Sequence, residues 1–390
     1  MQKRRIILDK GQSPGDIVVF SGAVRDLKKA YPEWEIDIRT CCPAVFEANP
    51  YLTSLKETAG EPTFEIIAEN CQRHDVEVPA DAKQYPAVLD GLVRKRLVGC
   101  KRVGDRFHYY HSDGFEDSPN GPGFRDDSLL FMVTPQEGTP DPVEMYDVGY
   151  RDINNSGWSG RHFSTAYHME LEQLLGVRVP QTDLRPDLHL SDKERSWVNQ
   201  VEETTGYAGP FWLIAAGHKH DFPVKQWGFE RWWKLVDLLQ DRVQFVQIGH
   251  EAGPNHSQPA FDKRVINLVG KTDLRQLIRL VYHAQGVVCH VSLPMHLAAA
   301  FGKPCVVIAG GREAPRWEMY PDHRFLHTNG QLPCCGYDGC WMTGRNPDAG
   351  QNKKCKNMVG GDPRCMAMIS PEQVAKEIEG YYTGGRLCYA

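Results

Sequence analysis

Five cysteines near the C-terminus have the side-chain type and the grouping of a metal-ligand set: Cys334, Cys335, Cys340, Cys355 and Cys365. Glycines are frequent between them, and apolar residues from 330 to 362 show neither helical nor strand periodicity. This segment therefore cannot build a hydrophobic core, while ordering it costs about 1 to 2 kcal/mol per residue of backbone entropy. A thiolate-bound ion is the simplest way to offset that cost, so the sequence predicts one structural metal ion per chain.

Four thiolates complete a tetrahedral site, so one of the five cysteines is spare. We favour Cys335, Cys340, Cys355 and Cys365 on loop length, although Cys334 could replace Cys335. Iron and zinc both accept four thiolates, so residue type does not choose between Fe³⁺ and Zn²⁺. The Cys-x-x-Cys spacing of a standard zinc finger is absent from this segment. The alternative interpretation is a set of reduced free thiols.

A carboxylate near the N-terminus has a position suited to chemistry. Asp16 follows the apolar run 5–8 and the turn Pro14-Gly15, at the mouth of an expected helix. Backbone N–H groups at such a mouth can bind a ligand, but a carboxylate there would repel phosphate. Asp16 suits a general base or a partner for a sugar hydroxyl. The alternative is that Asp16 only caps the helix and stabilises its dipole.

Basic and glycine-bearing turns in the second half of the chain favour an anion site. The sequence 216–220, AGHKH, and then Lys225 follow one apolar run, and Gly310-Gly311-Arg312 follows another. Glycine lets backbone N–H groups approach phosphate closely, and lysine or arginine adds charge. Between them, Ser292-Leu293-Pro294 opens a short helical stretch whose N-terminus would also favour an anion. An ordinary strand-helix-strand crossover is the alternative for this last stretch.

The elements expected to position these residues alternate between strand and helix. The first half predicts a strand at 5–8, a helix carrying Ile17, Phe20, Val24 and Leu27, and a strand at 34–38. The second half predicts strands at 211–215, 243–248, 265–268, 287–289 and 305–309, helices around 232–239, 274–281 and 294–301, and a final helix at 371–382. This alternation predicts an α/β protein with doubly wound parallel sheets. Residues 105–155, rich in His, Asp, Gly and Pro, read as a long loop that contacts a polar acceptor.

Two separated stretches resemble glycosyltransferase family 9, the family of bacterial ADP-heptose:lipopolysaccharide heptosyltransferases. One is the loop and helix that carry Ser292, Pro294, Met295, His296, Leu297, Ala298, Ala299, Gly302, Lys303 and Pro304; the other is PGDIVVFSGAVRDLKKAYPEWEIDI, with Ala48-Asn49-Pro50 after it. The resemblance implies the GT-B fold, in which two Rossmann-like domains face a cleft. We expect an acceptor domain at 1–180, a nucleotide-sugar domain at 193–330, a Cys-rich metal-binding segment at 331–368 and a C-terminal helix at 369–390. The stretch 176–192 contains prolines, is polar and lacks helical periodicity, so we expect it to link the two domains.

The same resemblance assigns roles to individual residues. Asp16 matches the general base, Lys225 of Lys225-Gln226-Trp227 matches the lysine on the donor diphosphate, and Glu251 matches the residue that contacts the ribose. The other expected donor contacts are Ser292, Pro294, Met295, His296, Gly310, Gly311 and Arg312. We expect Trp227 to serve packing. Val291 stands where the family carries a donor-contacting Asp, which leaves the donor base and sugar open.

The Cys-rich segment resembles that of the autotransporter heptosyltransferases, in which four cysteines hold an iron ion and the enzyme forms a large ring. Cys340-Trp341 and Arg364-Cys365 match that pattern. The resemblance therefore implies an iron site and a homo-oligomer. Function then follows as an inverting transfer of a sugar, expected to be heptose from ADP-heptose, to a hydroxyl of a protein or a glycan, with no catalytic metal. The alternative, suggested by Val291, is a non-catalytic nucleotide-sugar-binding or glycan-binding protein on the same fold.

Composition sets wider limits. With 390 residues the chain suits two domains, and a formal charge of −5 gives no reason to expect nucleic acid as a partner. The first residues lack an apolar stretch long enough for a signal peptide or a membrane span, so we expect a cytoplasmic protein. In that compartment the 12 cysteines should be thiols or metal ligands rather than disulfides.

Overall fold

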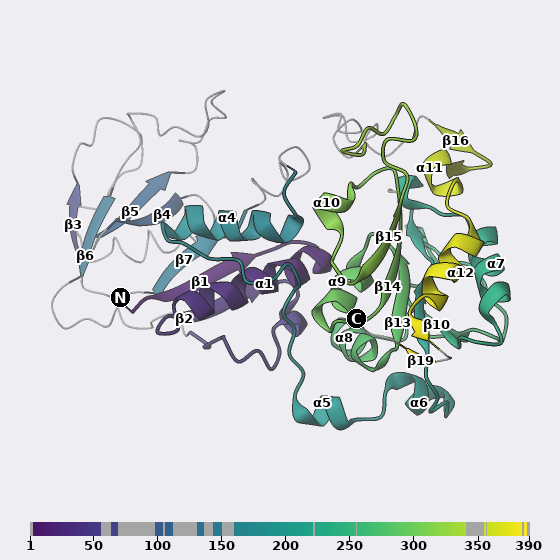
Figure 1. Ribbon diagram of the computed structural model, residues 1–390. Coiled ribbons are helices and arrows are strands. Elements are labelled where there is room, and N and C mark those ends of the chain that lie inside the picture. Colours follow the sequence, from purple (N-terminus) through teal and green to yellow (C-terminus); the bar gives the residue numbers. More distant parts are fainter. Residues whose placement is uncertain are drawn as a thin grey trace.

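A computed structural model describes the chain at residues 3–55, 64–68, 98–103, 106–111, 131–135, 143–149, 160–220, 223–254, 256–340, 355, 357–383 and 386–387. These residues form two α/β units side by side, each built on a parallel sheet, as Figure 1 shows. The predicted α/β class is therefore confirmed.

The first unit is centred on β1 (Arg5–Lys10), which lies between β2 (Glu35–Thr40) and β7 (Val143–Asp147). Both neighbours pair with β1 in parallel. Helices α1 (Pro14–Ala30) and α4 (Phe163–Leu175) pack together over this sheet, with the Phe20 and Tyr167 rings 5.5 Å apart. Proline at the start of α1 and left-handed Gly176 at the end of α4 (φ 65°) give the two helices the boundaries that their sequences indicate.

A four-stranded antiparallel sheet lies at the end of the first unit that is remote from the second (Figure 1). Its order is β3 (Phe64–Ala68), β6 (Phe131–Pro135), β5 (Arg106–His111) and β4 (Val98–Val103). The prediction of one loop over 105–155 is wrong for β5, β6 and β7. Their aromatic and β-branched residues favour strands, a signal that the neighbouring Gly, Pro and Asp residues obscured. Residues 112–130, 136–142 and 150–159, on which the acceptor prediction also depends, lie outside the described part.

The second unit contains a six-stranded parallel sheet in the order β12, β10, β8, β13, β14, β15. The strands are β8 (Trp212–Ala215), β10 (Phe245–Gln247), β12 (Ile266–Asn267), β13 (Gly286–His290), β14 (Cys305–Gly310) and β15 (His323–His327). Five were predicted, and β15 was missed because His, Arg and His flank its two apolar residues. Strand order reverses between β8 and β13, where sheets of this kind bind ligands at their carboxyl edge.

Helices cover both faces of this sheet. Figure 1 shows α8 (Leu274–His283) and α9 (Leu293–Ala300) on the face toward the first unit, and α7 (Phe229–Leu239) and α12 (Pro371–Glu379) on the other. The remaining short elements are η1 (Pro43–Val45), α5 (Asp192–Ser196), α6 (Gln200–Thr205), β9 (His218–Lys219), η4 (Pro223–Lys225), β11 (His256–Ser257), α10 (Pro315–Glu318), β16 (Met358–Val359), β17 (Asp362–Pro363), α11 (Arg364–Ala367), β18 (Tyr382–Thr383) and β19 (Arg386–Leu387). None of the described helices combines the length and the apolar character needed to cross a bilayer.

The two units share buried apolar surface. Ile17 and Val45 of the first unit belong to one core cluster with Met295 and Leu280 of the second. In the other direction, Trp317 of α10 is buried in the core of the first unit and lies edge-on to Phe163, with ring centroids 6.2 Å apart. Separating the units would expose these side chains to water. The interface that these side chains form between the two units, here called the seam, is therefore a stable part of the fold.

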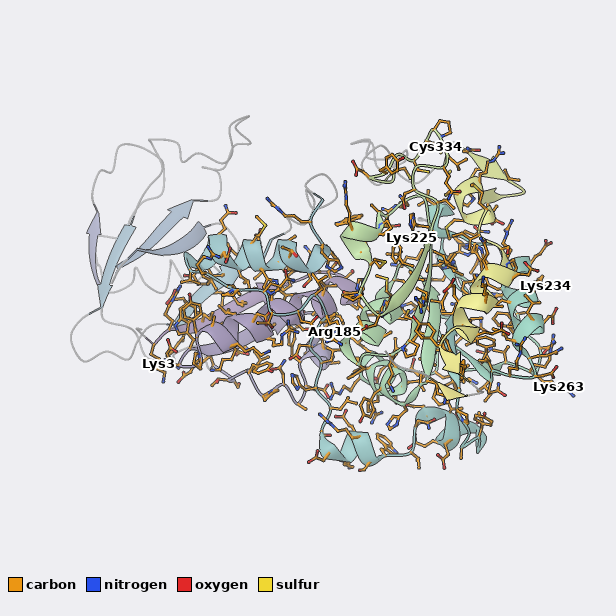
Figure 2. All side chains as sticks on the ribbon, viewed as in Figure 1. Lys3, Arg185, Lys225, Lys234, Lys263 and Cys334 are labelled. Atoms are coloured by element: carbon orange, nitrogen blue, oxygen red, sulfur yellow. The ribbon has the colours of Figure 1, made fainter. Side chains whose placement is uncertain are left out.

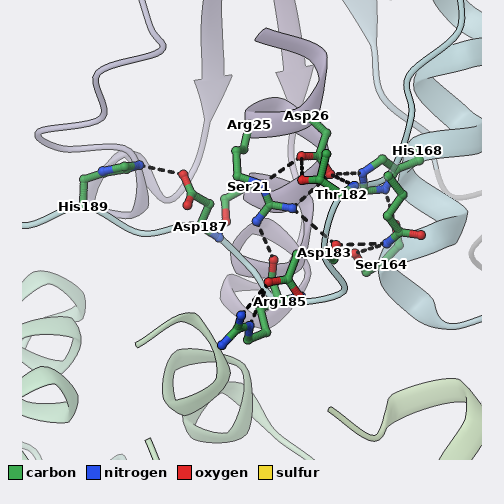
Figure 3. A network of polar contacts seen from close by, with 11 residues as sticks. Ser21, Arg25, Asp26, Ser164, His168, Thr182, Asp183, Arg185, Asp187 and His189 are labelled. Carbon is green, nitrogen blue, oxygen red and sulfur yellow. Dashed lines mark hydrogen bonds and ion pairs between the residues drawn. The ribbon is translucent and has the colours of Figure 1, made fainter. Parts of the chain in front are cut away.

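A buried polar network fixes α1 to α4 and to the chain that leaves the first unit (Figure 3). The Asp26 carboxylate accepts hydrogen bonds from Arg25, from His168 and from both the backbone and the hydroxyl of Thr182. Arg25 also donates to the Arg185 carbonyl at 2.9 Å. Burial alone would raise the pKa of Asp26, but its hydrogen bonds from His168, Arg25 and Thr182 lower it well below the usual value.

Candidate active site at the seam between the units

The carboxyl edges of the two parallel sheets meet at the seam. Helix α1 starts after β1, and α9 starts after β13, so both N-termini lie at these edges. A Cβ atom placed on Gly15 would lie 3.5 Å from the His296 ring and 3.9 Å from the Leu293 Cα. The glycine allows this close approach of α1 to α9. The structure thus brings together the stretches around Asp16 and Ser292 that the sequence analysis singled out separately.

Asp16 lies in the first turn of α1 and is half-buried. Its carboxylate accepts a hydrogen bond from the Ser13 hydroxyl at 2.6 Å. A negative charge in a first turn also favours the helix dipole, so the capping alternative and a chemical role are compatible. The catalytic role of Asp16 stays a prediction.

Lys10 at the end of β1 was not singled out from the sequence. It is fully buried, and its ammonium donates to the carbonyls of Val148 and Gly149 at 2.9 Å each. Burial lowers the pKa of Lys10 to about 8, against the opposing charges of Asp16, Glu170 and Asp147. Its only signal in the sequence is a lysine at the end of a buried strand.

Lys225 lies beside the switch point of the second sheet. Figure 2 shows it below the segment that carries Cys334 in that view, and its side chain is partly exposed. Its ammonium donates to the Val291 carbonyl at 2.9 Å and forms an ion pair with Glu313, also at 2.9 Å. Arg312 pairs with the same carboxylate. Burial alone would raise the pKa of Glu313, but Arg312 and Lys225 hold it below its usual value, so this carboxylate stays ionised.

The predicted donor contacts on α9 are largely buried. Met295 is completely buried, Pro294 is buried, and the His296 Nδ1 atom lies 2.9 Å from the Tyr320 hydroxyl. Burial lowers the pKa of His296 to about 3, so its ring is neutral. Ser292 donates to the His290 carbonyl and does not cap the helix. These residues therefore offer a ligand chiefly the backbone N–H groups at the start of α9.

The remaining predicted donor residues lie on the same sheet edge, with different surroundings. Glu251 is exposed in the turn after β10 and lies against Gly270. A Cβ atom on Gly311 would lie 2.6 Å from the Cys335 sulfur, and one on Gly310 (φ 63°) would meet Met366. The two glycines are thus required by the packing of the Cys-rich segment. Trp227 is fully buried and donates to the Ile369 carbonyl at 2.9 Å, so the packing role expected for it is confirmed.

The described cysteines of the C-terminal segment gather above β14. Burial raises the pKa of Cys340 to about 12 and that of Cys365 to about 11, and Cys335 contributes to both shifts. Cys355 also acts on Cys365. Cys334 is exposed, whereas Cys335 is buried. Trp341 lies outside the described residues.

No group of three or more His, Cys, Asp or Glu side chains among the described residues is arranged so that it could hold a metal ion. The predicted metal site is therefore not confirmed. The four thiols fit a soft ion in type and converge on one place, but they are not in ligating geometry.

Glu318 is a second residue that sequence reasoning missed. It ends α10, is buried, and lies among the charges of Glu313, Lys225, Asp16 and Arg312. Burial and then the Glu313 carboxylate raise the pKa of Glu318 to about 8. No local pattern marks it, because its neighbours come from both units and only the folded chain brings them together.

The chain is similar in sequence to known glycosyltransferases. Residues 156–335 match the family model described as glycosyltransferase family 9 (heptosyltransferase). Lipopolysaccharide heptosyltransferase 2 of Escherichia coli (strain K12) is 24% identical over 314 residues, which cover 76% of this chain and 80% of that protein. Lipopolysaccharide heptosyltransferase 2 of Salmonella typhimurium (strain LT2) is 22% identical over 315 residues, with the same coverage.

Solved structures share the fold. The family 9 glycosyltransferase of Veillonella parvula DSM 2008 superposes with a TM-score of 0.53 at 16% identity, over 97% of this chain and 96% of that one. The iron-containing dodecameric glycosyltransferase TibC of enterotoxigenic E. coli H10407 superposes with a TM-score of 0.52 at 16% identity, over 97% of this chain and 76% of that one. From these sequence matches the chain is a glycosyltransferase, similar to the heptosyltransferases of family 9.

Proposed function

We propose that this enzyme transfers a heptose from ADP-heptose to a hydroxyl group of a protein or glycan acceptor, with inversion at the anomeric carbon. The observation that carries the proposal is the seam, where the turn before Asp16 lies against the start of α9. A base on one unit thereby faces an anion site on the other. TibC has been solved in complex with ADP-D-beta-D-heptose, which supports the choice of donor.

In the proposed reaction, Asp16 accepts the proton of the acceptor hydroxyl as its oxygen attacks the anomeric carbon. The bond from that carbon to the diphosphate breaks, and ADP leaves as an anion. Lys225, Arg312 and the N–H groups at the start of α9 stabilise the charge on the leaving diphosphate. Glu251, on the same sheet edge, accepts hydrogen bonds from the ribose hydroxyls.

The decisive variant is Asp16→Asn. We expect ADP affinity close to that of the wild type, with heptose transfer lowered about hundredfold, the usual scale for a general base. Asp192→Asn is the matched control, because Asp192 is an exposed aspartate in the first turn of another helix. Turnover by Asp16→Asn equal to that of the control would remove Asp16 from the mechanism. A wild-type enzyme that neither binds ADP nor breaks down ADP-heptose would reject the donor.

We also propose that Cys335, Cys340, Cys355 and Cys365 hold one structural iron or zinc ion, and that the chain forms a homo-oligomer. Convergence of these thiols above β14 supports the ion, which would order a segment poor in apolar contacts. Elemental analysis should find about one ion per chain. A red-brown protein would indicate iron and a colourless one zinc. Well under one ion per chain, with all five thiols of the segment freely titratable, would end this proposal. Light scattering would test the oligomer.

A further inference from the structure

One oxygen of the buried Glu318 carboxyl group has no hydrogen-bond partner among the described residues. The side chain is 7% exposed, and its Oε2 atom makes no hydrogen bond to any described residue. An unpaired buried carboxyl oxygen is costly, so native proteins rarely keep one without a use. A ligand that enters the seam would supply the missing partner.

The surroundings of this carboxyl locate it within the proposed reaction site. The charged groups that act on it are Glu313, Lys225, Asp16 and Arg312. Asp16 comes from the first unit and the others from the second. Glu318 therefore lies within reach of the charges of both the proposed base and the cations proposed to hold the diphosphate.

The short helix that carries Glu318 is held on both sides. Trp317 is buried in the core of the first unit, and Tyr320 is buried beside the rings of His162 and His296. The His162 ring also lies against the backbone of Glu318 and Met319. A group held this firmly meets the requirement of a reaction site for fixed geometry.

We propose that Glu318 is a catalytic residue that donates a hydrogen bond from its neutral carboxyl group to an oxygen of the bound nucleotide sugar. The inference rests on the proposed function, since it requires a nucleotide sugar bound at the seam. Burial and Glu313 raise the pKa of Glu318 to about 8, so the group still carries its proton at neutral pH. An ionised Glu318 would instead add negative charge next to Asp16 and Glu313 and would repel the diphosphate.

Other groups near the seam must be separated from Glu318 in a pH titration. Burial lowers the pKa values of His162, His296 and His323 to about 4, 3 and 3, so these rings do not change charge between pH 6 and 10. Lys10, which faces Asp16, has a pKa of about 8 and titrates in the same range. A substitution of Glu318 itself is therefore required.

The test compares Glu318→Gln and Glu318→Ala with the wild type, using ADP as the binding probe and ADP-heptose as the substrate. Glu318→Ala, which has no donor, should lower turnover about hundredfold, the scale for losing one oriented donor. Glu318→Gln keeps an N–H donor and should lose only about tenfold. Wild-type turnover should fall about tenfold per pH unit above pH 8, and Glu318→Gln should lack this fall. Glu372→Gln makes the same substitution at an exposed site on α12 and should match the wild type.

The outcomes separate this inference from the proposed function. If Glu318→Gln keeps the fall above pH 8, another group such as Lys10 is responsible and the inference is overturned. Turnover by a folded Glu318→Ala within twofold of the wild type overturns it as well. Normal turnover by Asp16→Asn together with impaired Glu318 variants would reject only the base assignment. A wild type that neither binds ADP nor breaks down ADP-heptose would reject the proposed function, and the inference with it.

Discussion

Removing the Asp26 carboxylate should destabilise the whole first unit. Asp26 is 1% exposed, and its two oxygens accept five hydrogen bonds from Arg25, His168 and Thr182 at 2.5 to 2.9 Å. In Asp26→Asn the amide has the same shape but no charge, and its NH₂ group must face other donors. The buried Arg25 guanidinium then loses its counter-charge. Breaking a buried ion pair in this way costs about 3 to 5 kcal/mol.

Urea unfolding at pH 7 would measure this loss as a change in the free energy of unfolding. Its pH dependence gives a second check. Because the folded protein lowers the pKa of Asp26, its contribution is fully present above the unfolded value near 4 and is lost as the pH falls below it. The gap between wild type and Asp26→Asn should therefore shrink below about pH 4. Asp241→Asn changes an exposed aspartate and should leave the unfolding curve in place. A loss under about 1 kcal/mol, or a gap independent of pH, would refute the reasoning.

Two further variants test other parts of the structure. Lys225→Ala should weaken ADP binding by about 1.5 to 3 kcal/mol, because one charge-assisted contact to the diphosphate is lost; equal affinity in calorimetry would place the phosphate elsewhere. Gly311→Ala should destabilise the protein by about 1 to 3 kcal/mol, because the new Cβ would lie 2.6 Å from the Cys335 sulfur. Gly253→Ala is its control, since nothing lies within 4 Å of that position, and equal thermal stability of the two variants would contradict the packing argument.

Helices and strands that depend on local sequence signals were predicted from the sequence. Prolines at the first turns of α1 and α9, and the short β-branched runs of β13 and β14, led to these elements with boundary errors of a few residues. Strand β15 was missed because three of its five residues are polar, and its place as the sixth strand of the sheet depends on pairing with β14. The antiparallel sheet was missed for a similar reason, since its pairing partners are far apart in the chain.

The residues of the candidate site also fall into those that local sequence signals locate and those that only the folded chain brings together. Asp16 and Lys225 could be located because each follows a buried strand at a sheet edge, where ligands of such folds bind. Glu318 could not, because its importance depends on charges from Asp16 and Lys225 that only the folded chain brings near it. The double glycine at the end of β14 was predicted to let its backbone approach a phosphate, and that role stays a prediction. The atoms that approach it, from Cys335 and Met366, could not be read from the sequence.

The insertion of Trp317 into the first unit has a consequence for protein synthesis. The core around Phe163 and Tyr167 lacks this indole until the ribosome has made most of the second unit. At ordinary elongation rates the delay is on the order of 10 s. During that time the nascent first unit presents an unfilled apolar site, which is the kind of surface that chaperones bind. The core of the first unit is therefore completed late, by a residue that belongs to the second unit.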